Sequence, residues 1–301
     1  MRKEWKIGFI LTTVILTVVL LRECVATSYL IPSSGMENVL YQGERILVNR
    51  WSYGLRLPFM KLWGYHRWAE NDVAREDIIV FNNPANRKEK VIDQREVFIS
   101  RCIGLPGDTL LMDTLFNISA AANSSPDQKF LYAYPKEKEA QLDSLLARLS
   151  ISQEKPVGGD SIRNIRNFSR YEYYLLEQAM NDSCWISLLH PQEAVANLNP
   201  FIIPHQGSTL RVYPWNRALL CNTLLLHEGK KAAIVNDTLY VDGKPVEECH
   251  FTKDYHWVVS GSPISLSDSR LFGWVPKDHI IGKASYIWFS ADKERIGKHV
   301  R

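Results

Sequence analysis

One uncharged apolar run near the amino terminus constrains this chain more than any other feature. It covers residues 7–21 and is bounded by Lys6 and Arg22. As a helix it would be about 22 Å long, which is shorter than the roughly 30 Å hydrocarbon core of a bilayer. Snorkelling of the two flanking cations, or local thinning of the bilayer, can make up the difference. We therefore expect residues 6–24 to form a single transmembrane anchor.

The charges before this run predict its orientation. Arg2, Lys3 and Lys6 outweigh Glu4, and an excess of basic residues marks the cytoplasmic end of a membrane span. We expect a single-pass protein of the inner (plasma) membrane with a cytoplasmic amino terminus. The main domain would then be periplasmic or otherwise extracytoplasmic.

A cleavable signal peptide is the alternative interpretation, because the length of the apolar run also fits one. No good Ala-x-Ala cleavage site follows the run before Pro32. A lipoprotein signal at Cys24 is disfavoured because Arg22 and Glu23 precede it. An uncleaved anchor is therefore favoured.

Length and composition limit the domain count and the partners. With 301 residues, the chain is about twice the size of a typical domain, so it holds one elaborated domain or two small ones. A net charge of +3 gives no indication of nucleic-acid binding. The five cysteines include no Cys-x-x-Cys pair, and the eight histidines no His-Glu-x-x-His spacing. We expect neither a metal nor a cofactor.

Hydrophobic patterning after the apolar run predicts a mainly β protein. Strand-like stretches lie at residues 46–48, 78–81, 97–99, 232–241, 257–259 and 284–289. Turns are expected at Gly107, at Asn236-Asp237 and at Asp242-Gly243. Residues 113–205 differ, because helices are expected near 135–150 and 170–180, and we interpret this region as an insertion of unknown role. A third helix is expected at 214–228, ending at Gly229.

A short stretch after the apolar run, residues 29–40, has an unusual combination of features. Tyr29 to Ser33 alternates like a strand, and Pro32 restricts that strand to the edge of a sheet. Ser33, Ser34 and Gly35 then turn the chain. Read alone, this is either an ordinary turn or a functional loop.

The sequence of this stretch resembles the nucleophile box of type I signal peptidases, which runs Pro-Ser-x-Ser-Met-x-x-x-Leu. Four further stretches match boxes of that family in the same order, namely residues 43–54, 75–81, 98–108 and 268–283. The resemblance implies a signal-peptidase-like β fold with an α-containing insertion. The implied organisation is a cytoplasmic amino terminus (1–5), an anchor (6–24), a core in two parts (28–112 and 206–292), the insertion (113–205) and a tail (293–301).

The resemblance fails at the chemical positions. The family uses a serine nucleophile and a neutral lysine as its base. Gly35 stands at the nucleophile position and Ser100 at the general-base position. Leu266 stands where the family has the serine that orients the lysine. The Gly-Asp-Asn-Arg run that the family has before Asp268 is replaced by Ser-Gly-Ser-Pro at residues 260–263. Ser34 is an alternative nucleophile, although a shift of one residue points a side chain to the opposite face of an extended segment.

Other positions of the family's site are retained. Ser33 matches the oxyanion donor, and Asp268, Ser269 and Arg270 match supporting residues. The positions that match substrate-binding residues are Tyr29, Ile31, Met36, Leu40, Ile46, Phe98 and Ile99. The alternative is that these apolar side chains are ordinary core residues.

Two functions remain open on these residues. The favoured hypothesis is a catalytically inactive signal peptidase I homologue that binds extended, export-signal-type peptides such as preprotein signal sequences, or that regulates an active paralogue. The alternative is an active serine endopeptidase that removes signal peptides from exported proteins through an unorthodox nucleophile. The expected partners are the membrane, such peptides and an active signal peptidase paralogue, with no nucleic acid. A second homologue with Ser and Lys intact in the same genome would favour the first hypothesis.

Overall fold

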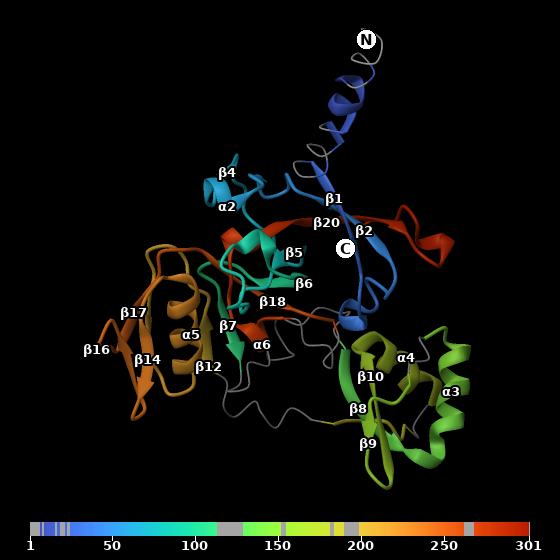
Figure 1. Cartoon of the computed structure of the whole chain (residues 1–301). Coiled ribbons are helices and arrows are strands. Elements are labelled where there is room, and N and C mark those ends of the chain that lie inside the picture. Colours follow the sequence, from blue (N-terminus) through green and yellow to red (C-terminus); the bar gives the residue numbers. More distant parts are fainter. Residues whose placement is uncertain are drawn as a thin grey trace.

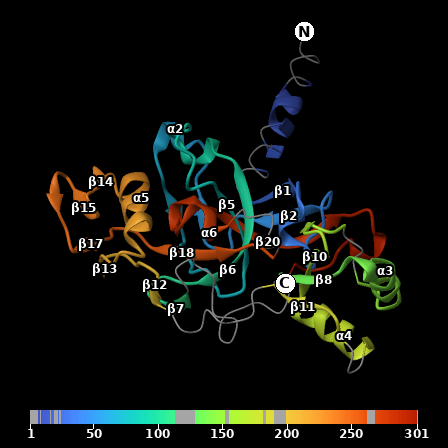
Figure 2. The ribbon, with the colours of Figure 1, turned by 90° about the horizontal axis from the view of Figure 1, so that it is seen from below.

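The computed structural model describes residues 7, 9–15, 17–18, 22, 25–112, 129–151, 155–180, 184–189, 199–261 and 268–300. The architecture is mainly β, as expected from the sequence, with a curled antiparallel sheet at its centre (Figures 1 and 2). Leu266 and the residues around it at 262–267 lie outside the described part.

The central sheet has seven strands in the order β1-β2-β20-β5-β6-β18-β19, and every neighbouring pair is antiparallel. The strands are β1 (Ala26–Leu30), β2 (Arg45–Asn49), β20 (Ile280–Phe289), β5 (Ile78–Asn82), β6 (Val97–Gly104), β18 (Tyr255–Val259) and β19 (Val275–Pro276). Register shifts interrupt the β2–β20, β20–β5 and β18–β6 pairs. Such irregularities bend strands and increase their twist, which accounts for the curl.

Alternate residues of the central strands fill two apolar clusters on opposite faces of the sheet. Ile78 and Val80 of β5 belong to a cluster that we call the groove cluster, with Ile31, Met36, Leu40 and Ile46. Ile79 and Phe81 of the same strand belong to a second cluster on the other face. Because side chains of a strand alternate in direction, a strand buried on both faces reads as a continuous apolar run.

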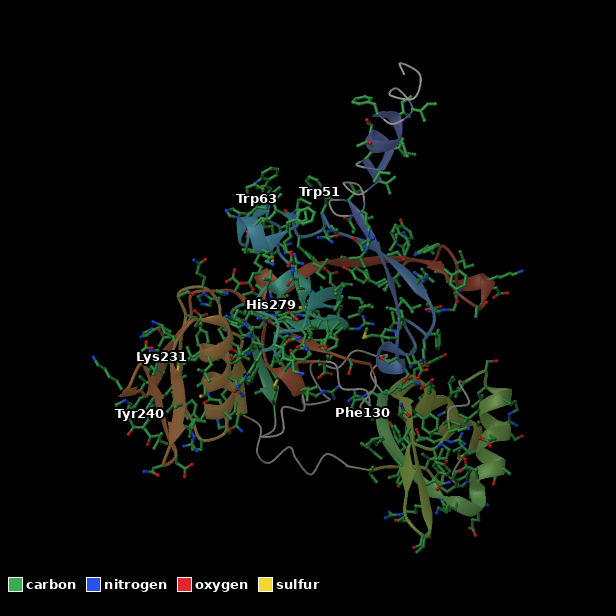
Figure 3. All side chains as sticks on the ribbon, in the orientation of Figure 1. Trp51, Trp63, Phe130, Lys231, Tyr240 and His279 are labelled. Carbon is green, nitrogen blue, oxygen red and sulfur yellow. The ribbon has the colours of Figure 1, made fainter. Side chains whose placement is uncertain are left out.

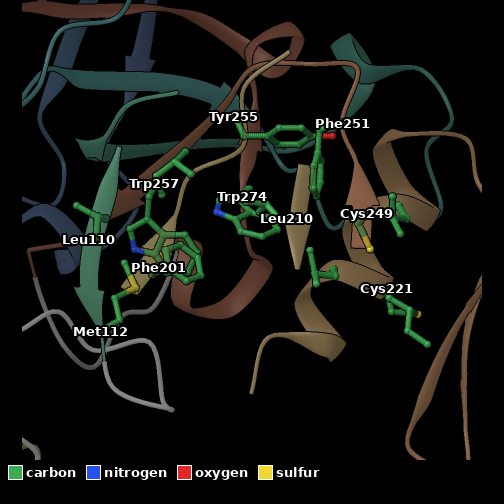
Figure 4. Close-up of a cluster of buried hydrophobic side chains, with 14 of the residues drawn as sticks. Leu110, Met112, Phe201, Leu210, Cys221, Cys249, Phe251, Tyr255, Trp257 and Trp274 are labelled. Carbon is green, nitrogen blue, oxygen red and sulfur yellow. The ribbon is translucent and has the colours of Figure 1, made fainter. Parts of the chain in front are cut away.

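A lobe with a third cluster stands at one end of the sheet. It contains β7 (Thr109–Met112), β12 (Asn199–Ile202), β13 (Thr209–Arg211), α5 (Arg217–His227), β14 (Ala232–Val235), β15 (Thr238–Val241), β16 (Lys244–Pro245) and β17 (Glu248–His250). Figure 4 shows its aromatic centre, in which the Phe201 ring lies 4.7 Å from Trp257 and 5.3 Å from Trp274, between ring centroids. Trp257 belongs to β18, so this cluster joins the lobe to the central sheet.

The second lobe lies within the expected insertion and has its own sheet and core. Its elements are β8 (Lys129–Pro135), α3 (Glu139–Arg148), β9 (Gly158–Gly159), β10 (Arg163–Ser169), α4 (Arg170–Met180) and β11 (Ser187–Leu188), with a short 3-10 turn, η3 (Lys136–Lys138). The strand order is β11-β8-β10-β9. β12, inside the expected range 113–205, pairs with β7, so the chain returns to the first lobe at Asn199.

The remaining elements are short. They are η1 (Ser34–Met36), β3 (Leu55–Arg56), α2 (Met60–Trp63), β4 (Arg67–Trp68), η2 (Ile92–Gln94), α6 (Ser269–Phe272), η6 (Lys277–His279) and η7 (Lys293–Arg295). The helices expected near 135–150, 170–180 and 214–228 correspond to α3, α4 and α5. Gly107, Asn236, Asp237, Asp242 and Gly243 all have positive φ, which confirms the predicted turns.

The segment expected to be the anchor is only partly described. Its described residues are helical, and the apolar side chains among them, such as Phe9 and Leu11, are exposed. No helix within the described ranges is long and apolar enough to cross a membrane.

Candidate functional site

The Ser-Ser-Gly turn lies where edge strand β1 ends. Beyond β1 the chain stays beside β2 for one further residue, because the Ile31 amide donates to Glu44 O at 2.8 Å. Ser33 is extended, and Ser34, Gly35 and Met36 form η1. The turn is anchored on its apolar side by Ile31, Met36 and Leu40, which are buried in the groove cluster. Ser33 and Ser34 are half-buried and Gly35 is buried.

A glycine from the other end of the chain lies against this turn. A Cβ on Gly261 would stand 3.2 Å from Glu37 O and 3.6 Å from Gly35 O. The backbone at Gly261 therefore packs directly on the backbone of the turn. Val259, two residues earlier, pairs with Arg101 of β6, so residues 260–261 continue past Ser100. The structure thus brings the segments of Gly35, Ser100 and Gly261 together.

The expected supporting residues form one buried network beside this contact. The carboxylate of Asp268 is fully buried and accepts hydrogen bonds from the amide and the hydroxyl of Ser260, both at 2.7 Å. It also accepts from the Arg270 amide at 3.0 Å and from its guanidinium. Ser269 Oγ accepts from the Val258 amide at 2.9 Å. Asp268, Ser269 and Arg270 therefore fix the start of α6 to the end of β18.

A lysine that sequence reasoning missed also reaches the turn. Lys129, the first residue of β8, is almost completely buried, and its Nζ lies 3.4 Å from Oε2 of Glu37. Its backbone amide donates to Gly261 O at 2.7 Å. Figure 3 shows the neighbouring Phe130 at the end of the insertion that faces the central sheet. No local motif marks Lys129, because only the fold brings the insertion back to residues 35–37.

The apolar residues matched to substrate positions divide into two groups. Ile31, Met36, Leu40 and Ile46 are buried in the groove cluster, and Tyr29 and Ile99 pack against it half-buried. Phe98 points to the opposite face, where its ring stacks on Phe272 at 5.8 Å. Leu40 and Ile46 have no exposed surface, so in this conformation they are core residues. The half-buried side chains are the ones that a ligand can reach.

Two strand edges border the groove cluster. β1 is the edge strand of the sheet. The hydrogen bond from the Ile31 amide to Glu44 O shows which residues of this segment bond to β2. Because hydrogen-bonded residues alternate along an antiparallel strand, the main-chain groups of Ser28 and Leu30 face away from β2. β6 pairs with β18 only from Arg101 onward. By the same alternation, the main-chain groups of Val97 and Ile99 face away from β5. Among the described strands, no partner pairs with β6 at Val97 and Ile99 on that side.

The electrostatics at Ser100 are those of a dry interior. Ser100 has no exposed surface. Burial, and secondarily the nearby carboxylate of Asp77, raises the pKa of the Cys102 thiol two residues along β6 far above its ordinary value. Within the described part of the chain, no three His, Cys, Asp or Glu side chains are grouped as metal ligands.

The fold and this site define a class, a curled β protein with a Ser-Ser-Gly turn beside open strand edges. A model of the family described as signal peptidase, peptidase S26, matches residues 3–183. The chain is 27% identical over 278 residues to signal peptidase I of Buchnera aphidicola subsp. Schizaphis graminum, across 92% of this chain and 72% of that protein. Signal peptidase I of Aquifex aeolicus is 24% identical over 277 residues, across 92% of this chain and 81% of its own. A shorter match is to signal peptidase I of Pseudomonas fluorescens, which is 36% identical over 98 residues. This match covers 32% of this chain and 31% of that protein.

Because the family model covers more than half of the chain, this protein belongs to the signal peptidase S26 family.

Proposed function

We propose that this chain is a membrane-anchored member of the S26 family that binds extended export-signal peptides without cleaving them. The observation that carries the proposal is the pair of strand edges beside the groove cluster. Edge-facing main-chain groups of Ser28, Leu30, Val97 and Ile99 can bond to an added strand, while Tyr29 and Ile99 offer apolar contacts to its side chains.

The loss of chemistry follows from the residues at the turn. Gly35 has no side chain to attack a carbonyl, and the Ser100 hydroxyl cannot accept a proton near neutral pH. Binding does not require either group, because affinity depends on contacts made before any covalent step. We expect micromolar or weaker affinity, equivalent to about −8 kcal/mol at best.

The supporting residues keep a binding role in this proposal. Asp268, Ser269 and Arg270 attach the backbone of Val258 and Ser260 to the start of α6, at the end of the strand that pairs with β6. Ser33 remains available as a hydrogen-bond donor to a peptide carbonyl, the role that the family resemblance gives it. The anchor and its cytoplasmic amino terminus also belong to the proposal, and the basic residues before the apolar run support them.

The test is photo-crosslinking of a signal peptide to the full-length protein in detergent. We expect Ile99→Asp to lower crosslinking about tenfold, because a carboxylate beside the groove cluster loses its hydration on binding. Leu30→Pro removes an amide that faces the open edge and does not bond to β2. This substitution should therefore lower the crosslinking yield as well. Ile162→Asp, at an exposed position of the insertion, is the matched control. Equal crosslinking in all four proteins would refute the proposal.

The second candidate is an active peptidase that uses Ser34. Two observations favour it, namely that Ser34 is half-buried at the start of η1 and that Lys129 reaches the same turn. The ion pair with Glu37 opposes it, since a neighbouring carboxylate favours the charged ammonium, which cannot accept a proton. Signal-peptide cleavage by the unmodified protein that disappears in both Ser34→Ala and Lys129→Met would establish this candidate.

A further inference from the structure

The two open strand edges beside the groove cluster, which we call the peptide site, both stop at the same end. On β6 the main-chain groups of Val97 and Ile99 are open. From Arg101 onward β18 occupies that edge, because Val259 pairs with Arg101. A peptide strand added to β6 would therefore meet the end of β18. It can continue no farther than Ser100, which has no exposed surface.

β1 stops offering hydrogen-bond partners at the corresponding point. After Leu30, Ile31 uses its amide and its carbonyl for bonds to the loop before β2. Pro32 follows on the open side, but it has no amide hydrogen to donate. Its carbonyl already accepts a hydrogen bond from Gln42 Nε2 at 3.0 Å. An added strand can therefore pair with β1 only as far as Leu30.

The chain that follows β18 fills the space between these two ends. The backbone of Gly261 packs on the backbone of Gly35 and Glu37. The Gly261 carbonyl accepts a hydrogen bond from the Lys129 amide at 2.7 Å, which holds it in place. Gly35 itself is buried. The peptide site thus has an open end, where β1 and β6 begin, and a closed end at the Ser-Ser-Gly turn.

The closed end suits a peptide that terminates there, because a longer chain would have to leave the site at the turn. The Ser33 hydroxyl makes no capping bond to η1, and Ser33 and Ser34 are both half-buried. Hydroxyl groups bond more strongly to a carboxylate than to a neutral carbonyl. The nearby carboxylate of Glu37 would repel such a ligand, but Lys129 Nζ lies 3.4 Å from its Oε2 and offsets its charge.

We propose that the peptide site takes the free carboxyl end of a cleaved signal peptide in preference to an uncleaved preprotein. Ser33 and Ser34 donate to the terminal carboxylate, and Lys129 permits this by neutralising Glu37. The proposal rests on the proposed function, since the same strand edges bind the peptide, and it names the released peptide as the ligand. An endopeptidase that cleaves preproteins must then act before this chain.

The test measures the binding of three fluorescent synthetic peptides to the full-length protein in detergent by fluorescence anisotropy. The first ends in Ala-Ser-Ala with a free carboxylate, and the second is its carboxamide. The third continues into Gly-Ser-Gly-Ser and ends in a carboxamide. We expect the free acid to bind about tenfold more tightly than the extended peptide and about fivefold more tightly than the short carboxamide.

The outcomes separate this proposal from the proposed function. Equal affinities of the free acid and the extended peptide would overturn the closed end and leave peptide binding intact. Equal affinities of the free acid and the short carboxamide would overturn the carboxylate contact. If none of the three peptides binds, both the proposed function and this proposal fail.

Two substitutions with opposite expected effects test the ion pair. Glu37→Gln leaves the charge of Lys129 in place and should raise the affinity for the free acid about threefold, whereas Lys129→Met should lower it by a similar factor. Neither should change the affinity for the short carboxamide, which a damaged fold would lower. Lys136→Met, at an exposed position of η3, is the matched control. Shifts of the same sign in both variants would overturn the role given to Lys129.

Discussion

Among single residues, Glu44 contributes more to the site than its place in a loop suggests. Its carboxylate is buried and accepts hydrogen bonds from Arg295 Nε at 2.6 Å, Ser290 Oγ at 2.9 Å and the Tyr41 amide at 2.9 Å. Arg295 also donates to Val39 O at 2.7 Å. This one carboxylate therefore attaches the segment after the Ser-Ser-Gly turn to the end of β20.

The Glu44 network predicts a defined acid sensitivity. Burial alone would raise the pKa of Glu44, but the hydrogen bonds from Arg295, Tyr41 and Ser290 lower it below the usual value of 4.5. A lowered folded-state pKa contributes stability that is complete above about pH 4.5 and is lost as the pH falls through the folded-state pKa. We expect Glu44→Gln to cost about 1–3 kcal/mol at pH 7.

The measurement is urea unfolding at pH 7 and at pH 3.5. The difference between Glu44→Gln and the unmodified protein should shrink at the lower pH, because protonation of Glu44 in the unmodified protein removes the same charge that the substitution removes. Glu294→Gln, on the exposed η7, is the matched control and should change nothing. A penalty for Glu44→Gln that is equal at both pH values would contradict this account.

At the scale of elements, the insertion is attached to the functional turn by its first strand. The Lys129–Glu37 ion pair and the bond from Lys129 N to Gly261 O join β8, η1 and the end of β18. Removing one member of a buried ion pair leaves the other charge without its partner, at a cost of about 3–5 kcal/mol. We expect Lys129→Met to cost about that much, and Glu37→Leu with Lys129→Met to cost less than the sum of the single changes.

A double-mutant cycle by urea unfolding measures this coupling. Lys136→Met, on the exposed η3 of the same lobe, is the control for loss of a lysine from the insertion. Additive effects of the two substitutions would mean that the turn and the insertion do not stabilise each other through this pair. The backbone bond to Gly261 would then be the contact that places the insertion.

For the whole molecule, the sequence predicted what depends on local patterns. These patterns are the apolar run of β5, the turn at Asn236-Asp237 and the family boxes. Each of them is contained in the same few residues whose structure it specifies. Contacts across the chain had no such signal. Lys129 and Glu37 are 92 residues apart, and the inward orientation of Arg56 depends on carbonyls more than 220 residues away. Phe98 matches a substrate-binding position of the family, but alternation along β6 directs its side chain to the face of the sheet opposite to that of Ile99.

The junction between the first lobe and the sheet predicts a second effect of acid. His227 of α5 and His279 of η6 lie 5.2 Å apart between ring centroids, facing Arg95, Lys253 and Asp278. Burial lowers the pKa of both rings, and it lowers that of His256 in β18 to about 4.

Because the pKa values of these histidines are lowered in the folded state, only the unfolded chain takes up protons as the pH falls below about 6.5. The free energy of unfolding is therefore highest above about pH 6.5 and decreases at lower pH. Each histidine contributes a slope of roughly 1.4 kcal/mol per pH unit within its window. Urea midpoints measured from pH 7.5 to pH 5 should fall, and His227→Gln should reduce the slope, whereas His66→Gln, at an exposed position, should not. A flat profile would contradict this prediction.

The last prediction concerns the restoration of chemistry. Position 100 has no exposed surface, so a lysine there would lose charge and approach the neutral form that a base requires. Even so, we expect Gly35→Ser with Ser100→Lys to remain without activity. A dyad works as a unit, and the leucine at position 266 cannot donate or accept the hydrogen bond that orients a lysine.

The assay is cleavage of a preprotein in detergent by the unmodified chain, the double variant and a triple variant that adds Leu266→Ser. We expect background cleavage from the unmodified chain and the double variant, and measurable cleavage only from the triple variant. A triple variant that carries Gly35→Ala in place of Gly35→Ser should lose this cleavage. Cleavage by the double variant would show that position 266 is dispensable. Cleavage by the unmodified chain would contradict the loss of chemistry itself, because no contact formed by Gly35 can supply a nucleophile.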